Sequence, residues 1–335
     1  MAGFETARDA YNEQESRRLR SDKKITYPKE NDEQVTQIKG FVTDALEKSG
    51  IGREGMKALI ERDDELKARF IAVVNKMRVE ENPYVREKID QKYCYPEGWL
   101  IPGIDEQKKR LSKIFSGRCG YKDISLVRVD EMVAKATVPE QADGLVLIPK
   151  ISYLGELGFK DPYGKEYGLI MDRVITMISQ SRPFRNFCEG GLSFSRIRLH
   201  EQIRLLTKQL EADTPGDVLV MPVSLGNLYA GYSARNARWE ALHSDQLPLG
   251  SAQVGCLLLM MPERLATYKN LGIYCSGDEY STPSYKRATF DFDSSPKFYF
   301  YDYNGKGKDG KIIFYYNSTN RADDRFSSAV VFLSK

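Results

Sequence analysis

Apolar side chains recur along this chain with two different periods, and the change of period divides it. Between residues 35 and 95 they return every three or four positions, for example at Leu66 and Phe70, which is the period of an amphipathic helix. Gly50 closes the first of these stripes and is typical of a helix C-cap. The pattern predicts a helical module over 35–95, preceded by a polar tail over 1–34 that we expect to lack fixed structure unless a partner orders it.

The rest of the chain, from a hinge over 93–103 onward, mixes the helical and strand periods. Helical spacing predicts helices at 104–115, 170–178, 194–212, 233–244 and 250–265. Short apolar runs predict strands at 124–129, 144–151 and 216–224. The last third changes to aromatic and β-branched runs between turn residues, at 271–275, 288–293, 297–303, 310–316 and 329–333. We therefore predict an α+β body over 96–335, in which helices precede a set of antiparallel strands.

Composition places the chain among ordinary globular proteins. Of its 335 residues 41% are hydrophobic and 29% charged, and the formal net charge is +3. No apolar run approaches the roughly 20 residues of a membrane-spanning helix, and the start of the chain lacks the apolar region of a secretory signal. We expect no membrane insertion and a cytoplasmic location, with export by another route left open. The five cysteines are scattered and form no C-x-x-C pair, which favours buried reduced thiols over disulfides or a zinc site.

Basic residues gather in two places. The run Arg17–Lys24 lies in the polar tail and is compatible with an intracellular structural or nucleic-acid-associated protein, although the balanced net charge disfavours nucleic acid as a partner. Arg235 and Arg238 stand three residues apart beside Trp239. We predict an amphipathic helix whose arginines pair with carboxylates, and anion binding is the alternative.

The motifs usually associated with cofactors and metals fail in their context. Two stretches, Gly50–Gly55 and Gly305–Gly310, fit G-x-G-x-x-G, but neither stands between a strand and a helix, as dinucleotide binding requires. The run His200–Arg204 begins like a zinc-protease motif and lacks its second histidine. The stretch that begins at Asp302 resembles a calcium loop but has Ile313 where a bidentate glutamate is needed. None of these motifs indicates a cofactor or a metal, and the sequence leaves metal binding elsewhere open.

Two adjacent carboxylates, Asp278 and Glu279, offer the strongest candidate chemistry. Paired carboxylates perform acid–base catalysis when a cleft brings them to one substrate, so an enzyme that uses them with Arg238 is one alternative for the function. The other interpretation is structural, with the carboxylates capping a turn or pairing with an arginine such as Arg264 or Arg287.

The segment 297–328 differs from the rest of the chain in its many tyrosine, asparagine, aspartate and serine residues. If it forms a strand at its start, alternation places Phe298 and Phe300 on one side and Tyr299, Tyr301 and Tyr303 on the other. Tyrosine supplies large contact area at low entropy cost, and the short polar residues supply hydrogen bonds, which is the composition of antibody binding sites. The pattern predicts a recognition surface, and an exposed loop without a ligand is the alternative.

Several segments together resemble known proteins, namely PEGWLIPGIDEQKKRLSKIF, GDVLVMPVSLGNLYAGYSARNARWEAL, LPLGSAQVGCLLLMMPERLATYKNLGIYCSGDEYS and the closing SSAVVFL. The chain resembles a group of uncharacterised bacterial proteins that share a body and vary at the C-terminus. It is also similar to the variable proteins of diversity-generating retroelements. The resemblance implies a C-type-lectin-like domain over about 216–335 that presents a diversified ligand-binding face.

The resemblance also implies which residues bind. Carried onto this sequence, the diversified positions would be Tyr299, Tyr301, Tyr315, Tyr316, Asn317, Ser318, Asn320, Asp323, Asp324 and Phe326. Scaffold positions would be Gly310, Phe314, Ala322, Ala329, Phe332 and Leu333. The expected function is non-catalytic binding of a protein or other macromolecular ligand. The helical module is expected to form a homo-oligomer, which would add avidity to weak single contacts.

Overall fold

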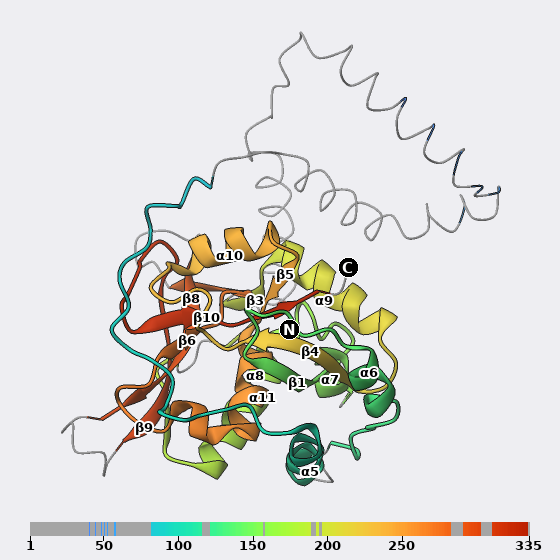
Figure 1. Ribbon diagram of the computed structural model, residues 1–335, viewed down its shortest axis with the longest axis horizontal. Coiled ribbons are helices and arrows are strands. Elements are labelled where there is room, and N and C mark those ends of the chain that lie inside the picture. The colour runs from blue at the N-terminus through green and yellow to red at the C-terminus, as the bar shows by residue number, and fades with distance from the viewer. Residues whose placement is uncertain are drawn as a thin grey trace, which may run out of the picture. The chain divides into compact units, whose positions relative to one another are not determined.

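The computed structural model describes residues 82–115, 121–156, 158–188, 192–193, 196–282, 291–302 and 310–333, with single positions before residue 58 (Figure 1). Several predictions lie outside these residues: the tail with Arg17–Lys24, nearly all of the helical module over 35–81, Arg287, Tyr303 and the glycine loop up to 309. The chain divides into two units, 1–66 and 67–335. In the first unit Asp44 and Lys48 are helical and form an ion pair of 2.8 Å, and Gly50 takes a positive φ of 67°, as a C-cap requires.

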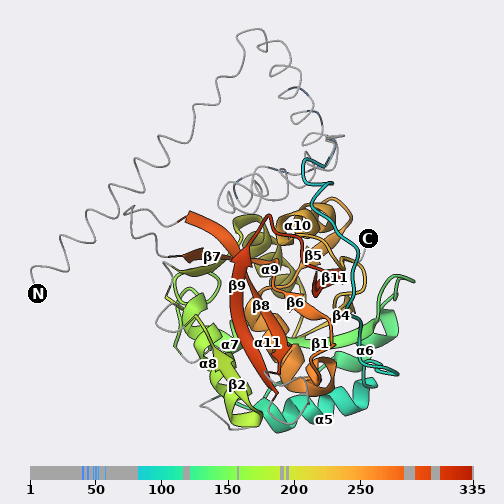
Figure 2. The same ribbon diagram turned by 90° about the vertical axis from the view of Figure 1, so that its left-hand side faces the viewer.

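The second unit combines helices and strands and is an α+β body. Its described helices are α5 (Ile104–Phe115), α6 (Val129–Lys135), α7 (Ile151–Gly155), α8 (Tyr167–Ser181), α9 (Glu201–Asp213), α10 (Ala234–Leu242), α11 (Ser251–Met260) and the 3-10 turn η2 (Pro262–Leu265). Its described strands are β1 (Gly144–Pro149), β2 (Phe184–Asn186), β3 (Ile197–Leu199), β4 (Val218–Ser224), β5 (Gln246–Pro248), β6 (Gly272–Tyr274), β7 (Asp278–Thr282), β8 (Asp291–Tyr301), β9 (Lys311–Ser318), β10 (Phe326–Ser328) and β11 (Val330–Phe332). Figures 1 and 2 show α10 and α5 at opposite ends of this unit.

The described strands form two sheets. The first is antiparallel with the order β1-β4-β11-β5. The second is mixed and is organised around the long strand β8 (Figure 2). One edge of β8 pairs with β7 near its start and with β6 near its end, while the other edge pairs with β9. Strands β3, β10 and β2 extend this sheet, on β7, β6 and β9 respectively.

Helix α11 lies in the centre of the core. Nearly all of its residues are buried, as the apolar run at 254–261 predicts, because a helix that is apolar on every side is stable only inside a protein. Gly255 lets α8 approach closely, since a Cβ at this position would lie 2.5 Å from a side-chain carbon of Val174 and 3.7 Å from the ring of Phe298. Helix α11 therefore connects α8 to the inner face of the second sheet.

A buried amide attaches α5 to the first sheet. Gln107 is fully buried on α5. Its Nε2 donates to the carbonyl oxygens of Pro102 and Leu145 at 2.7 and 2.9 Å, and its Oε1 accepts from the amide of Leu147 at 2.9 Å. The side chain thus satisfies backbone groups of β1 that would otherwise be buried without partners.

Several of the predicted elements differ from the structure. The strands expected separately at 288–293 and 297–303 belong to one strand, β8. The expected strand at 124–129 is an irregular segment followed by α6, because Arg128 takes a left-handed φ of 66° and the amide of Ser125 donates to Asp217 rather than to a strand. The expected helix at 194–212 begins only at Glu201, because residues 197–199 pair with β7. The run has helical spacing throughout, and a partner strand distant in sequence overrides it.

The thiol prediction is correct only in part. Cys188, Cys256 and Cys275 are buried and free, whereas Cys94 is free and exposed, which corrects the expectation for that residue. In the part of the chain with assigned structure, no helix combines the length and apolar character needed to cross a bilayer.

Candidate functional site

Strands β8 and β9 pair without interruption along the whole of β9, so their side chains stand on a continuous ladder (Figure 2). Phe298 is fully buried, and its ring centroid lies 4.8 Å from that of Phe314, its cross-strand neighbour. Tyr301 and Tyr315 are 38% and 37% exposed, while Tyr299 and Phe300 are both partly buried. The predicted directions of Phe298 and Tyr301 are confirmed. We call the side of the hairpin that carries Tyr299, Tyr301 and Tyr315 the tyrosine face.

A row of four rings leads from the interior to the tyrosine face. Tyr280 on β7 stacks on Tyr316 with centroids 4.4 Å apart, Tyr316 stacks on Tyr315 at 4.8 Å, and Tyr315 meets Phe187 edge-on at 5.9 Å. Phe187 follows β2 and is 45% exposed, and the guanidinium carbon of Arg185 lies 4.5 Å from its ring centroid. Stacked neighbours restrict the rotamers of these rings, so the exposed members are held in place before any ligand arrives.

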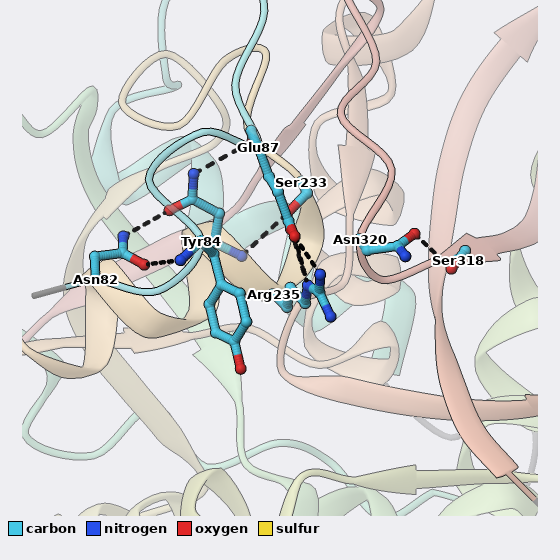
Figure 3. Close-up of polar contacts among 8 residues, drawn as sticks. Asn82, Tyr84, Glu87, Ser233, Arg235, Ser318 and Asn320 are labelled. Atoms are coloured by element: carbon cyan, nitrogen blue, oxygen red, sulfur yellow. Dashed lines mark hydrogen bonds and ion pairs between the residues drawn. The ribbon is translucent and has the colours of Figure 1, made fainter.

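The predicted polar side chains at the end of β9 form hydrogen bonds within the protein. Asn317 Nδ2 donates to the hydroxyl of Tyr274 at 3.3 Å. Ser318 Oγ donates to Oδ1 of Asn320 at 2.9 Å (Figure 3). Asn320 is exposed, and the other three side chains are at least partly buried. Of these polar groups, the amide of Asn320 is therefore the one most open to a ligand.

The two aspartates of the following loop have structural partners. Asp323 is buried and accepts from Nε and a terminal nitrogen of Arg325 at 2.9 and 2.8 Å, and this pairing lowers the pKa of Asp323 against the effect of its burial. Asp324 forms an ion pair of 2.9 Å with Lys92, and its carbonyl oxygen accepts from the amide of Lys92 at 3.0 Å. Burial removes Asp323 from the exposed surface where we expected it.

Phe326 is not a surface residue, which corrects its assignment as a binding position. It is 2% exposed and begins β10, which pairs in parallel with β6. Its ring lies 5.0 Å from that of Tyr274 and 5.5 Å from that of Tyr299. Gly272 makes room for it, since a Cβ there would lie 2.6 Å from the Phe326 ring. Phe326 therefore supports the tyrosine face from below.

The segment over 82–95 and helix α10 support the loop after β9. Glu87 forms an ion pair with Arg235 and accepts from the hydroxyl of Ser233 at 2.7 Å (Figure 3). The guanidinium carbon of Arg235 lies 4.6 Å from the ring centroid of Tyr84. The amide of Arg235 donates to the carbonyl oxygen of Thr319 at 3.0 Å. The predicted pairing of the α10 arginines with carboxylates is confirmed at this position.

The adjacent carboxylates Asp278 and Glu279 point to opposite sides of β7, as neighbours on a strand do. Asp278 is fully buried and accepts from the hydroxyl of Tyr167 at 2.9 Å and from the amide of Ser251 at 2.7 Å. Burial raises its pKa to about 7. Glu279 is paired with Arg198 at 2.9 Å. The two carboxylates are therefore not brought to one place.

The arginines considered together with these two carboxylates, Arg238 and Arg264, make contacts that stabilise the fold. Arg238 donates to the carbonyl oxygen of Asp278 at 2.8 Å and lies 3.8 Å from the Glu279 carboxylate. Arg264 is fully buried and donates to the carbonyl oxygens of Leu271 and Leu225, at 2.8 and 2.9 Å. Its pairing with Asp278 or Glu279, one of the alternatives above, is not found among the described residues, where Arg264 donates to backbone carbonyls instead.

Comparison of the chain with protein-family models, with curated proteins and with solved structures finds no match. The fold and the contacts above therefore carry the functional argument. Tyr299, Tyr301 and Tyr315 stand on one side of the β8–β9 ladder, and Tyr316 stacks on Tyr315. The structure adds Phe187, which lies over a hundred positions earlier in the chain and meets Tyr315 edge-on. No local pattern around Phe187 signals this role, because its contact arises from the parallel pairing of β2 with β9.

Proposed function

We propose that this protein binds a macromolecular ligand, without catalysis, through the tyrosine face and the exposed side chains next to it. We further propose that it belongs with the variable proteins of diversity-generating retroelements and that its last part is a C-type-lectin-like domain. The order of elements, with α10 and α11 before a largely antiparallel sheet, supports this assignment. A homo-oligomer formed by the helical module stays a prediction.

The row of rings on the β8–β9 ladder is the observation that carries the proposal. Exposed aromatic rings that are already held by stacked neighbours lose little conformational entropy when a ligand covers them. Tyr315 and Phe187 are both exposed and touch each other, and Tyr301 is exposed on the same side of the hairpin as Tyr315. Aromatic rings that a bound partner buries act as anchors in protein interfaces, and surrounding polar groups give direction.

The alternative of an enzyme that uses Asp278 and Glu279 gains no support from their geometry. Asp278 is fully buried, and Glu279 forms an ion pair with Arg198. A general base must come within hydrogen-bond distance of the proton it removes. Neither carboxylate is placed to do so beside the other.

The proposal is tested with variants of the exposed rings. A photo-crosslinking amino acid at position 301 would identify ligands, whose affinity is then measured with purified wild type, Tyr315→Ser and Leu169→Ser. Leu169 is 48% exposed on α8 and serves as the control. We expect Tyr315→Ser to weaken binding about tenfold or more, which corresponds to about 1.4 kcal/mol, and Leu169→Ser to leave it unchanged. Equal effects of the two substitutions would contradict the proposal.

A further inference from the structure

The ammonium group of Lys297 lies among aromatic rings at the centre of the tyrosine face. Its Nζ is 3.9 Å from the ring centroid of Phe326, 5.5 Å from that of Tyr299, 5.7 Å from that of Tyr274 and 5.9 Å from that of Tyr315. The residue is only 5% exposed. Ring faces attract a cation, but they do not replace the hydrogen bonds that an ammonium group makes in water.

No carboxylate forms an ion pair with Lys297 among the salt bridges of the described residues. The charged groups that act on Lys297 from a distance are Asp323, Arg325 and Arg321. Asp323 favours the charged amine, but its carboxylate is already held by Arg325 through two hydrogen bonds. Burial, together with the two guanidinium groups and against the effect of Asp323, lowers the pKa of Lys297 to about 8. A substantial part of the amine is therefore neutral near pH 8.

The four rings around the amine differ in exposure. Tyr315 is 37% exposed and Tyr299 is partly buried, whereas Phe326 and Tyr274 are buried. A small molecule would reach the amine from the side of Tyr315, the most exposed of the four rings. Arg321, which is exposed, would attract an anionic molecule to the same place.

We propose that Lys297 is a nucleophilic amine that forms an imine with small 2-oxo carboxylates. The neutral nitrogen attacks the ketone carbon, and the carbonyl electron pair moves to oxygen to give a carbinolamine. Loss of this oxygen as water, with the two amine hydrogens, gives the C=N bond, so no oxidant or reductant is needed. Uptake of one proton from the solvent gives the protonated imine, a delocalised cation that is less strongly hydrated than an ammonium group and therefore suits an aromatic cage better. The site shares Tyr299 and Tyr315 with the tyrosine face, but the imine chemistry does not require that a macromolecule binds there.

The test uses the complete wild-type protein with pyruvate and sodium cyanoborohydride, which traps an imine as a stable amine adduct. Mass spectrometry of the peptides compares adduct formation at Lys297 with that at the exposed Lys165. Because an ordinary lysine has a pKa near 10.4, we expect Lys297 to react at least about tenfold faster at pH 7.5 and to lose this advantage in denaturant. Its rate should fall as the pH drops below about 8.

Two variants separate the cage from the amine. Lys297→Met should remove the adduct from this peptide only. Tyr315→Ser keeps the amine but opens the cage, so the rate at Lys297 should fall toward that of Lys165. If Lys297 in the folded wild type reacts no faster than Lys165, the proposal is overturned, whether or not the variants fold. The labelling measures no macromolecular binding, so its failure would leave the proposed function untouched.

Discussion

Asp278 allows a quantitative prediction about the dependence of stability on pH. This carboxyl group is fully buried between α8, α11 and β7 and accepts hydrogen bonds from Tyr167 and Ser251. Burial raises its pKa from 3.8 to about 7. Asp278→Asn keeps the shape of the side chain and the oxygen that accepts from Ser251, and it mimics the protonated acid at every pH.

The sign follows from which state binds the proton more tightly. Between pH 4 and 7 the folded state keeps the proton on Asp278, whereas the unfolded state releases it, so the free energy of unfolding falls as the pH rises. The contribution of the neutral acid is fully present below pH 4 and is lost as the pH rises through 7. A difference of about three pKa units corresponds to about 4 kcal/mol. Asp278→Asn should avoid this loss.

The assay is urea unfolding of both proteins at half-unit steps from pH 4.5 to 8.5. We expect the free energy of unfolding of Asp278→Asn minus that of wild type to increase by about 3–4 kcal/mol over this range. The wild-type curve alone is not sufficient, because burial also lowers the pKa of His200 to about 4. The neutral form of His200 contributes stability above pH 6.5 that is lost as the pH falls, which opposes the effect of Asp278.

Asp105→Asn is the matched control. The Asp105 side chain is fully exposed on α5, so its substitution should leave the pH profile parallel to that of wild type. If the Asp278→Asn profile also runs parallel to that of wild type, Asp278 does not hold its proton in the folded state, and the reasoning from burial is refuted.

Further predictions concern packing, the buried amide and the gene. Phe326→Ser should lower the free energy of unfolding by about 3–5 kcal/mol, whereas Tyr315→Ser should change it by less than about 1 kcal/mol; equal losses in urea unfolding would show that Tyr315 is core. Gln107→Leu should cost about 3 kcal/mol, measured as a lower melting temperature, because the buried amide of Leu147 loses its acceptor. If the C-terminus is diversified, the neighbouring DNA carries a reverse transcriptase gene and a near-repeat of the last codons; their absence argues against diversification.

Local periodicity predicted much of the body because the side chains that decide it are neighbours along the chain. The helical stripe at 170–178 gives α8, the apolar run at 254–261 gives the buried helix α11, and alternation places Phe298 inside and Tyr301 outside. These features depend only on the angle between successive side chains in a helix or strand.

Partners distant in the chain decided what periodicity could not. Phe326 stands in a polar stretch of the sequence that is typical of an exposed loop, but the pairing of β10 with β6 buries it. Phe187 joins the tyrosine face only because β2 adds to β9. Likewise, Asp278 and Glu279 point apart because the segment 278–282 is a strand rather than a turn.

The sequence by itself determined the α+β class, the helices α5, α8, α10 and α11 and the segment in which exposed tyrosines gather. Only the tertiary structure decided that Lys297 lies among four rings and that Asp278 is sealed in the core. The physical reason is that desolvation of a charged group depends on everything packed around it, and those neighbours come from elements far apart in the chain.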